Sequence, residues 1–274
     1  MMELWTQGLT LAQASRATLF LLGLSLALQT LEYLVIDRRD RVLRFKVQIR
    51  EMPVRPGFLR PLLLRCFAPP IYRALLGLRM VLALSLMLGW QSLPVSMALM
   101  ALAMLLLFRW RGAFNGGSDF MTLMGLSALL LADGLAPWLG AQQAWRAALW
   151  FLTLQLLTSY FMSGWVKLKH PGWRNGSTLP VFLDTGVYGP LTSTSAYRRR
   201  PLAAMISWVF ILWEGLFGLV FLDVRLAWLA CASGVVFHFM VFRYFGLNRF
   251  FWAWLATYPA LIYTVTETGL SLKY

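Results

Sequence analysis

The sequence predicts an all-α membrane protein, a polytopic bundle of about eight transmembrane helices. Hydrophobic residues make up 59% of the 274 residues and charged residues only 13%, whereas soluble domains carry about 25% charged residues. The apolar residues come in long blocks, several of them close to the roughly 20 residues that a helix needs to cross a bilayer. Basic residues gather in alternate segments between these blocks. We therefore expect a single membrane domain over residues 1–274, with no sizeable soluble domain.

The first expected transmembrane helix covers residues 17–36. It lacks the basic leading region and the small-residue cleavage site of a secretory signal, and it is long enough to span, so we expect a retained helix. Gln29, Thr30 and Glu32 lie inside it. These polar residues predict that one face of the helix meets protein or water.

A basic segment, residues 37–73, follows this first helix. It is rich in arginine and is interrupted by prolines, and four apolar residues alternate with charge at Leu43, Phe45, Val47 and Ile49. Such a mixture of basic and apolar residues is typical of a segment that lies among the lipid headgroups. We therefore expect an interfacial segment here.

Seven further apolar blocks predict the remaining helices. They cover residues 74–93, 94–108, 120–139, 143–166, 201–222, 226–245 and 249–266. Gly116 and Gly117 precede the block at 120–139, so Ser118 or Asp119 is expected to cap the amino end of that helix. Arg79 lies near the start of an apolar block, where it either reaches the headgroups by snorkelling or pairs with a buried carboxylate.

The distribution of charge predicts the orientation of the bundle. The formal net charge of +14 would suggest nucleic acid for a soluble protein. Here the basic residues lie beside apolar helices, so we expect attraction to anionic lipid headgroups and no nucleic-acid partner. The segments after the first, third, fifth and seventh helices carry most of the lysines and arginines. The positive-inside rule places these segments in the cytoplasm and both termini outside.

The sequence does not predict a metal site or a common enzyme motif. Cys66 and Cys231 match no metal or redox spacing, and His170 and His238 are the only histidines. A P-loop, a dinucleotide-binding glycine pattern, an HExxH motif and a nucleophile elbow are all missing from the sequence.

Three polar residues in or beside the later apolar blocks are candidates for function. Glu214 is either a structural carboxylate held by hydrogen bonds or an ion pair, or a group that relays protons or orients a substrate. His238 stands among aromatic residues, where it either packs and bonds a backbone carbonyl, or acts in acid–base chemistry or contacts a quinone. Asn248 is expected to cap the amino end of the last helix.

Lys167 stands where the block at 143–166 gives way to a polar segment, residues 167–200. A lysine there is favoured by the helix dipole and can reach the headgroups. A lysine partly removed from water is also favoured in its neutral form, which is the form that acts as a base. The aromatic residues around it are those expected of an interfacial belt: Tyr160, Phe161, Trp165 and Trp173.

The stretch around Lys167 resembles a motif of a known family. Tyr160-Phe161-x-x-Gly164-x-x-Lys167-Leu168, followed by Trp173 and Gly176, resembles a helix-end motif of the vitamin K-dependent γ-glutamyl carboxylases. It resembles even more the bacterial branch, the horizontally transferred transmembrane (HTTM) domain proteins. Three other stretches agree with these families in the same order along the chain: Asn115-Gly116-Gly117-x-Asp119, Trp213-Glu214, and His238 with Gly246-Leu247-Asn248-x-Phe250 through Tyr258-Pro259-Ala260. The resemblance covers roughly residues 74–262.

This resemblance implies a role for Lys167. In the carboxylases the lysine of this motif deprotonates a hydroquinone, which reacts with oxygen to give a strong base. That base removes a proton from a glutamate side chain, and carbon dioxide adds to the carbanion. By resemblance, Lys167 is the catalytic base and a vitamin K-like reduced quinone is the cofactor, with no metal. The residues that the resemblance assigns to substrate or cofactor binding are Asn115, Asp119, Trp173, Glu214, His238 and Asn248.

The sequence departs from the carboxylases in several ways. The spacing from Lys167 to Trp173 is one residue longer, and Asn115 and Asp119 stand where the carboxylases have a histidine. We expect no counterpart of their large non-membrane domain, which binds the propeptide of the substrate. Carboxylation takes place on the non-cytoplasmic side, whereas the charge rule places Lys167 in the cytoplasm. The side that Lys167 faces is therefore left open.

Two hypotheses of function follow for a protein expected in the bacterial inner membrane. The first is a carboxylase-like enzyme that uses quinol-linked proton abstraction on a peptide or small substrate. The second is a non-catalytic membrane protein that binds a lipid or quinone and assists peptide maturation or export. The expected partners are membrane lipids, together with a peptide substrate or a co-encoded maturation partner. A secondary transporter is disfavoured, because the sequence shows no paired halves with broken helices.

Overall fold

The expected all-α class is confirmed. The computed structural model describes residues 2–39, 57, 59–110 and 116–269, and these ranges contain helices and connecting turns but no strand. The helices that organise the bundle are α2 (Leu11–Arg39), α5 (Pro69–Met87), α6 (Leu93–Arg109), α7 (Gly116–Leu139), α8 (Ala141–Lys169), α11 (Arg200–Gly215), α12 (Val224–Phe245), α13 (Asn248–Leu255) and α14 (Tyr258–Thr268). The shorter elements are α1 (Met2–Gln7), α4 (Leu59–Cys66), α9 (Pro171–Arg174), α10 (Thr178–Leu183) and the 3-10 helices η2 (Ala196–Arg198) and η3 (Phe217–Leu222).

Four of the described helices are long and apolar enough to cross a membrane. They are α2, α5, α7 and α12, and α6 is apolar but shorter. Large hydrophobic side chains on the outside of the bundle remain exposed, among them Val81, Leu212 and Met240. Long apolar helices with an apolar outer surface are compatible with an integral membrane protein.

Two of the expected helices are interrupted. The block at 249–266 is divided into α13 and α14, because Pro259 has no N–H to donate to the Leu255 carbonyl four residues earlier. The block at 201–222 is α-helical only as far as Gly215 and continues as the 3-10 helix η3. The expectation of a continuous α-helix was wrong for both blocks.

Only part of the expected interfacial segment can be compared with the structure. Residues 40–56 and 58 lie outside the described residues. The described helix α4 buries Leu63 and exposes Leu59 and Leu62. An exposed apolar face on a helix with basic residues is compatible with a position among the headgroups.

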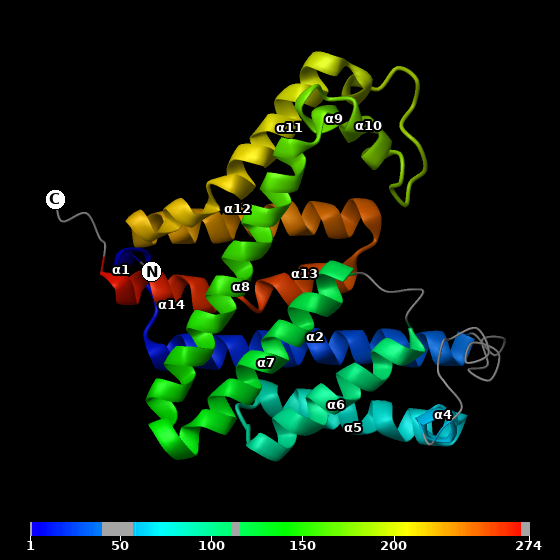
Figure 1. The fold of residues 1–274 in the computed structure, drawn as a ribbon, viewed down its shortest axis with the longest axis vertical. Helices are drawn as coiled ribbons and strands as arrows, with labels where there is room; N and C mark the ends of the chain where they lie inside the picture. The colour runs from blue at the N-terminus through cyan, green and yellow to red at the C-terminus, as the bar shows by residue number, and fades with distance from the viewer. Residues whose placement is uncertain (1, 40–56, 58, 111–115, 270–274) are drawn as a thin grey trace.

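The helices run in two directions (Figure 1). Helices α2, α5 and α12 and the α14–α13 pair lie roughly parallel across the view, whereas α8 and α11 run steeply across them. One core cluster joins α2 to α5, α6 and α7 through residues such as Leu26, Leu86 and Leu126. A second core cluster surrounds Tyr160 and joins α8 to η3, α12, α13 and α14. The candidate polar residues lie within or beside these two cores.

Candidate functional site

Lys167 and Glu214 form an ion pair where α8 ends beside α11. The Lys167 ammonium lies 2.7 Å from Oε2 and 2.9 Å from Oε1 of Glu214. It also donates to the Ser163 hydroxyl at 2.6 Å. The Glu214 side chain is 4% exposed and that of Lys167 is 19% exposed. The structure therefore brings two of the predicted site residues together and holds the lysine through three short contacts.

Lys167 and Glu214 meet because α8 and α11 cross at close range. Ser163 lies one turn before Lys167, and its hydroxyl donates to Glu214 Oε1 at 3.1 Å. Gly164 lets the two backbones approach, because a Cβ there would lie 2.7 Å from the Gly215 nitrogen and 3.1 Å from the Ile211 carbonyl oxygen. The role of Ser163 was missed, although its spacing of four residues from Lys167 on a helix could have indicated the contact.

Trp173 lies against the same ion pair. The chain leaves α8 at His170, whose Nδ1 accepts from the Gly172 N–H at 3.2 Å, and this turn begins α9. The Trp173 ring centroid then lies 5.7 Å from the Lys167 ammonium, within range of a cation–π interaction. Lys167, Glu214 and Trp173 form one cluster, which we call the lysine cluster.

His238 lies in a separate aromatic cluster. Its Nε2 is 2.8 Å from the Tyr160 hydroxyl, which is 3.0 Å from the Tyr258 hydroxyl. The His238 ring stacks on Trp254 with centroids 4.6 Å apart. No backbone carbonyl among the described residues bonds Nδ1, so the expected bond to a carbonyl is not made. Tyr160 is only 2% exposed. It therefore belongs to the core and not to an interfacial belt, whereas Phe161 and Trp165 are exposed as a belt requires.

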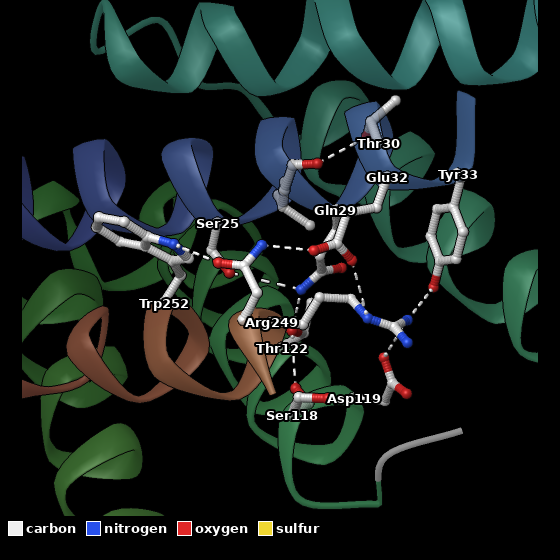
Figure 2. Close-up of polar contacts among 12 residues, drawn as sticks. Ser25, Gln29, Thr30, Glu32, Tyr33, Ser118, Asp119, Thr122, Arg249 and Trp252 are labelled. Carbon is white, nitrogen blue, oxygen red and sulfur yellow. Dashed lines mark hydrogen bonds and ion pairs between the residues drawn. The ribbon is translucent and has the colours of Figure 1, made fainter. Parts of the chain in front are cut away.

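Asp119 and Asn248 lie in a third cluster, where α2, α7 and α13 meet. Figure 2 shows Asp119 with Glu32 and Arg249 of this cluster. The Asn248 side-chain amide donates to Glu32, and Arg249 Nε lies 3.3 Å from the same carboxylate. Arg249 also donates to the Tyr33 hydroxyl at 2.8 Å and lies 3.9 Å from Asp119 Oδ1. We call this set the arginine network.

Both capping expectations for these residues were wrong. Asn248 is the first residue of α13 and its side chain reaches α2 instead of a backbone N–H. Helix α7 begins at Gly116, so Ser118 and Asp119 lie in its first turn. A carboxylate in a first turn still complements the positive end of the helix dipole.

Arg79 lies beside the arginine network, with its guanidinium carbon 6.0 Å from the centre of the Tyr33 ring, and is buried. It is 1% exposed, so it does not snorkel. Its guanidinium donates to the Leu26 carbonyl, to the Thr30 hydroxyl at 2.6 Å and to Gln29 Oε1 at 2.9 Å. Gln29 in turn donates to Thr122 at 2.9 Å. The polar face predicted for the first helix is therefore confirmed, and it meets protein.

A small cavity lies beside Arg79. Its polar lining comes from Gln29, Tyr33, Arg79, Asp119 and Thr122. The cavity measures about 10 Å³, which is room for about one water molecule. A larger ligand does not fit there without movement of the surrounding helices.

The predicted site residues are thus divided among three clusters. Lys167, Glu214 and Trp173 lie together, and Asp119 and Asn248 are connected through Arg249 and Glu32. The lysine cluster and the aromatic cluster adjoin, because Trp213, the neighbour of Glu214, packs edge-on against Tyr160 with centroids 5.1 Å apart. Asn115 lies outside the described residues. Within the described ranges, no group of three histidine, cysteine or acidic side chains could hold a metal ion.

Comparison with known proteins adds no assignment. No protein-family model matches the chain, and neither a curated protein nor a solved structure matches it significantly. The resemblance to the HTTM proteins and carboxylases therefore rests on the sequence motifs.

Proposed function

We propose that this chain is an HTTM-type membrane protein in which the Lys167–Glu214 pair exchanges a proton with a ligand from the membrane. The observation that carries the proposal is the ammonium–carboxylate contact of 2.7 Å between two side chains that are largely removed from water. The bacterial inner membrane is the proposed location. The proposed ligand is a reduced quinone. The proposed substrate, which loses a proton and accepts the carboxyl group as in the carboxylases, is a peptide or a small molecule.

Eight spans are part of this proposal. They are α2, α5, α6, α7, α8, α11 with η3, α12, and α13 with α14. The carboxyl ends of α2 and α12 and the amino end of α13 lie on one side of Figure 1. An even number of crossings returns both termini to the same side. The excess of basic residues beyond alternate helix ends favours a cytoplasmic position for the end of the bundle that carries the arginine network.

The geometry of the pair is suited to proton transfer. A charged pair in a partly dry site has lost part of its hydration, so the form with a neutral amine and a neutral carboxylic acid becomes less unfavourable than in water. The proton moves between them along a hydrogen bond that already exists. The neutral Lys167 amine can then accept a proton from an acidic hydroxyl, while Glu214 holds the proton it received. Ser163 keeps both groups in place through its two contacts.

The residues of the lysine cluster fit a hydroquinone. A hydroquinone presents a planar ring and hydroxyl groups, and the cluster offers the Trp173 ring, the Lys167 amine and the Glu214 carboxylate. Lys167 and Trp173 are both partly exposed, whereas Glu214 is buried. A bound reduced quinone would supply electrons and, with oxygen, the strong base that carboxylation requires.

A second candidate is a non-catalytic protein that binds a lipid or quinone and assists peptide maturation or export. The contacts of Lys167 also support this structural role, because Glu214 and Ser163 already accept hydrogen bonds from its ammonium. In this case the pair holds α8 to α11, and its loss affects stability alone.

Lipid extraction tests the proposal. The protein is purified with native lipids, and bound molecules are identified by mass spectrometry for the wild type, Lys167→Met and the control Lys169→Met. Lys169 ends the same helix and is exposed, with its ammonium 5.0 Å from the Trp165 ring. We expect a quinone in the wild type and in Lys169→Met, and its loss in Lys167→Met.

A second variant separates binding from folding. Lys167→Met leaves the buried Glu214 carboxylate without its cation, whereas Lys167→Met combined with Glu214→Gln removes both charges and preserves folding better. Quinone retained by the folded double variant would contradict a binding role for Lys167. If no preparation contains a quinone, the first candidate loses its cofactor and the second is supported.

A further inference from the structure

The Tyr160, His238 and Tyr258 side chains form a buried hydrogen-bonded chain that the proposed function does not use. They come from α8, α12 and α14, and each is at most 5% exposed. The bond from Tyr160 Oη to His238 Nε2 is 2.8 Å, and the bond between the two hydroxyls is 3.0 Å. Gly234 makes room for the hydroxyls, because a Cβ there would lie 2.3 Å from the Tyr258 oxygen. The chain geometry is therefore built into the packing of three helices.

The hydrogen bonds of this chain have two possible directions. If His238 donates to Tyr160, and Tyr160 to Tyr258, the Tyr258 O–H and the lone pair of His238 Nδ1 are left without a partner among the described residues. If Tyr258 donates to Tyr160, and Tyr160 to His238, the Nδ1–H group and the lone pair of the Tyr258 oxygen are left over instead. Each direction leaves one donor and one acceptor unpaired, so the packing is compatible with both. In the second direction the Tyr160 phenol points its proton at a neutral imidazole nitrogen.

Aromatic rings surround His238 and offer a route for an electron between Tyr160 and the outside of the bundle. The imidazole stacks on the face of Trp254 with centroids 4.6 Å apart, and an aromatic face attracts a cation. Trp213 is partly exposed on the outside of α11 and packs edge-on against Tyr160 at 5.1 Å. Its indole N–H is fixed by a bond of 3.0 Å to Ser233. Trp213 therefore connects the lipid-facing surface to the buried phenol.

We propose that Tyr160 and His238 are a redox-active pair, in which oxidation of the phenol by one electron is coupled to transfer of its proton to His238 Nε2. The oxidant is an oxygen-centred radical of the membrane, a lipid peroxyl radical. The O–H bond of Tyr160 breaks and an N–H bond forms on His238. The electron reduces the peroxyl radical to a peroxide anion, which takes a proton from water. A membrane hydroquinone returns the electron, releases one of its own protons to water and becomes a semiquinone, while His238 returns the first proton to the Tyr160 oxygen. The pair would protect the membrane domain from radical damage, and it does not depend on the role proposed for Lys167.

Flash photolysis tests the pair in the purified full-length protein. Tris(bipyridine)ruthenium, excited in the presence of persulfate, serves as the one-electron oxidant, and tyrosyl radicals are followed by transient absorption and electron paramagnetic resonance. We expect a long-lived tyrosyl signal in the wild type that disappears in Tyr160→Phe. The control Tyr197→Phe, which changes an exposed tyrosine, should keep the signal. A signal that survives in Tyr160→Phe, or a wild type without one, would overturn the proposal.

The role of His238 has its own readout. His238→Gln keeps a hydrogen-bond acceptor but cannot take the proton, so the yield of the radical should fall several-fold. The wild-type radical should also form more slowly in D₂O, because a proton moves with the electron. The isotope effect remains decisive if His238→Gln does not fold. A radical that forms equally fast in both solvents would exclude the coupled transfer.

Discussion

A single buried arginine shows how this bundle tolerates charge. Arg79 has no carboxylate within ion-pair distance among the described residues, and its hydrogen bonds go to neutral oxygens of α2. A buried guanidinium costs free energy unless its hydrogen bonds are made. The carbonyl of Leu26 and the side chains of Gln29 and Thr30 make three of them here, and Nε has no partner among the described residues. Gln29 and Thr30 of the first helix therefore hold Arg79 in place.

Truncation of Arg79 should destabilise the protein strongly. Arg79→Ala leaves a void and removes three hydrogen bonds, which we expect to cost about 3 kcal/mol or more. Arg79→Met fills the same space, and Gln29 and Thr30 keep their bonds to Thr122 and Leu26, so it should cost less than the alanine. The free energy of unfolding in detergent, measured by denaturant titration, compares the two.

Arg73→Ala is the matched control for this measurement. Arg73 is 57% exposed in its ion pair with Asp37, and an exposed pair contributes about 0–1 kcal/mol. Equal losses for Arg79→Ala and Arg73→Ala would contradict the structural role of the buried Arg79.

At the scale of elements, the crossing of α8 and α11 decides whether the lysine cluster exists. Gly164→Ala should separate the two helices, because the added Cβ would meet the backbone of α11 at 2.7 Å. We expect a loss of about 1–3 kcal/mol and weaker contact between Lys167 and Glu214. The midpoint of thermal unfolding and the accessibility of the lysine amine to acylation measure the two effects.

Gly77→Ala gives the comparison for a glycine with free space. Gly77 lies inside α5 and a Cβ there would meet nothing within 4 Å. Alanine is a better helix former than glycine by about 1 kcal/mol, so this variant should be neutral or stabilising. If both glycine variants behave alike, the close approach of α8 and α11 does not control stability.

The helices could be predicted from the sequence, but most of their contacts could not. Apolar length alone located the blocks. Lys167, Glu214 and Trp173 lie close in the structure, whereas Asp119 and His238, which the resemblance assigns to the same site, lie in the other two clusters. The bond between Asn248 and Glu32 joins residues 216 positions apart, and no local pattern in the sequence encodes such a pairing. The break before α14 was predictable in principle, because Pro259 stands in the interior of an apolar block. Tyr160 was misplaced because an aromatic residue near a helix end fits both an interfacial belt and a core.

At the scale of the whole molecule, the path of α8 determines the topology. It is not among the four helices that are apolar enough to be candidate spans, yet its 29 residues give a length of about 43 Å. The hydrocarbon core of a bilayer is about 30 Å thick, so a strongly tilted helix of this length still crosses it. The polar residues of α8 are also partly covered by neighbouring helices: Ser159 contacts Met121 of α7, and Ser163 and Lys167 contact Glu214 of α11.

Cysteine labelling should therefore find the two ends of α8 on opposite sides of the membrane. The two native cysteines are first removed by Cys66→Ser and Cys231→Ala. Gln142→Cys then places an exposed thiol at the amino end of α8, and Ser193→Cys places one in the segment that follows its Lys167 end. A maleimide that cannot cross the membrane should label Gln142→Cys in intact cells and Ser193→Cys only after lysis, because the basic segment stays in the cytoplasm. The reverse pattern would keep eight spans but invert the bundle, which places Lys167 on the side where the carboxylases act. If both thiols react from the same side, α8 does not cross and the count of eight spans is wrong.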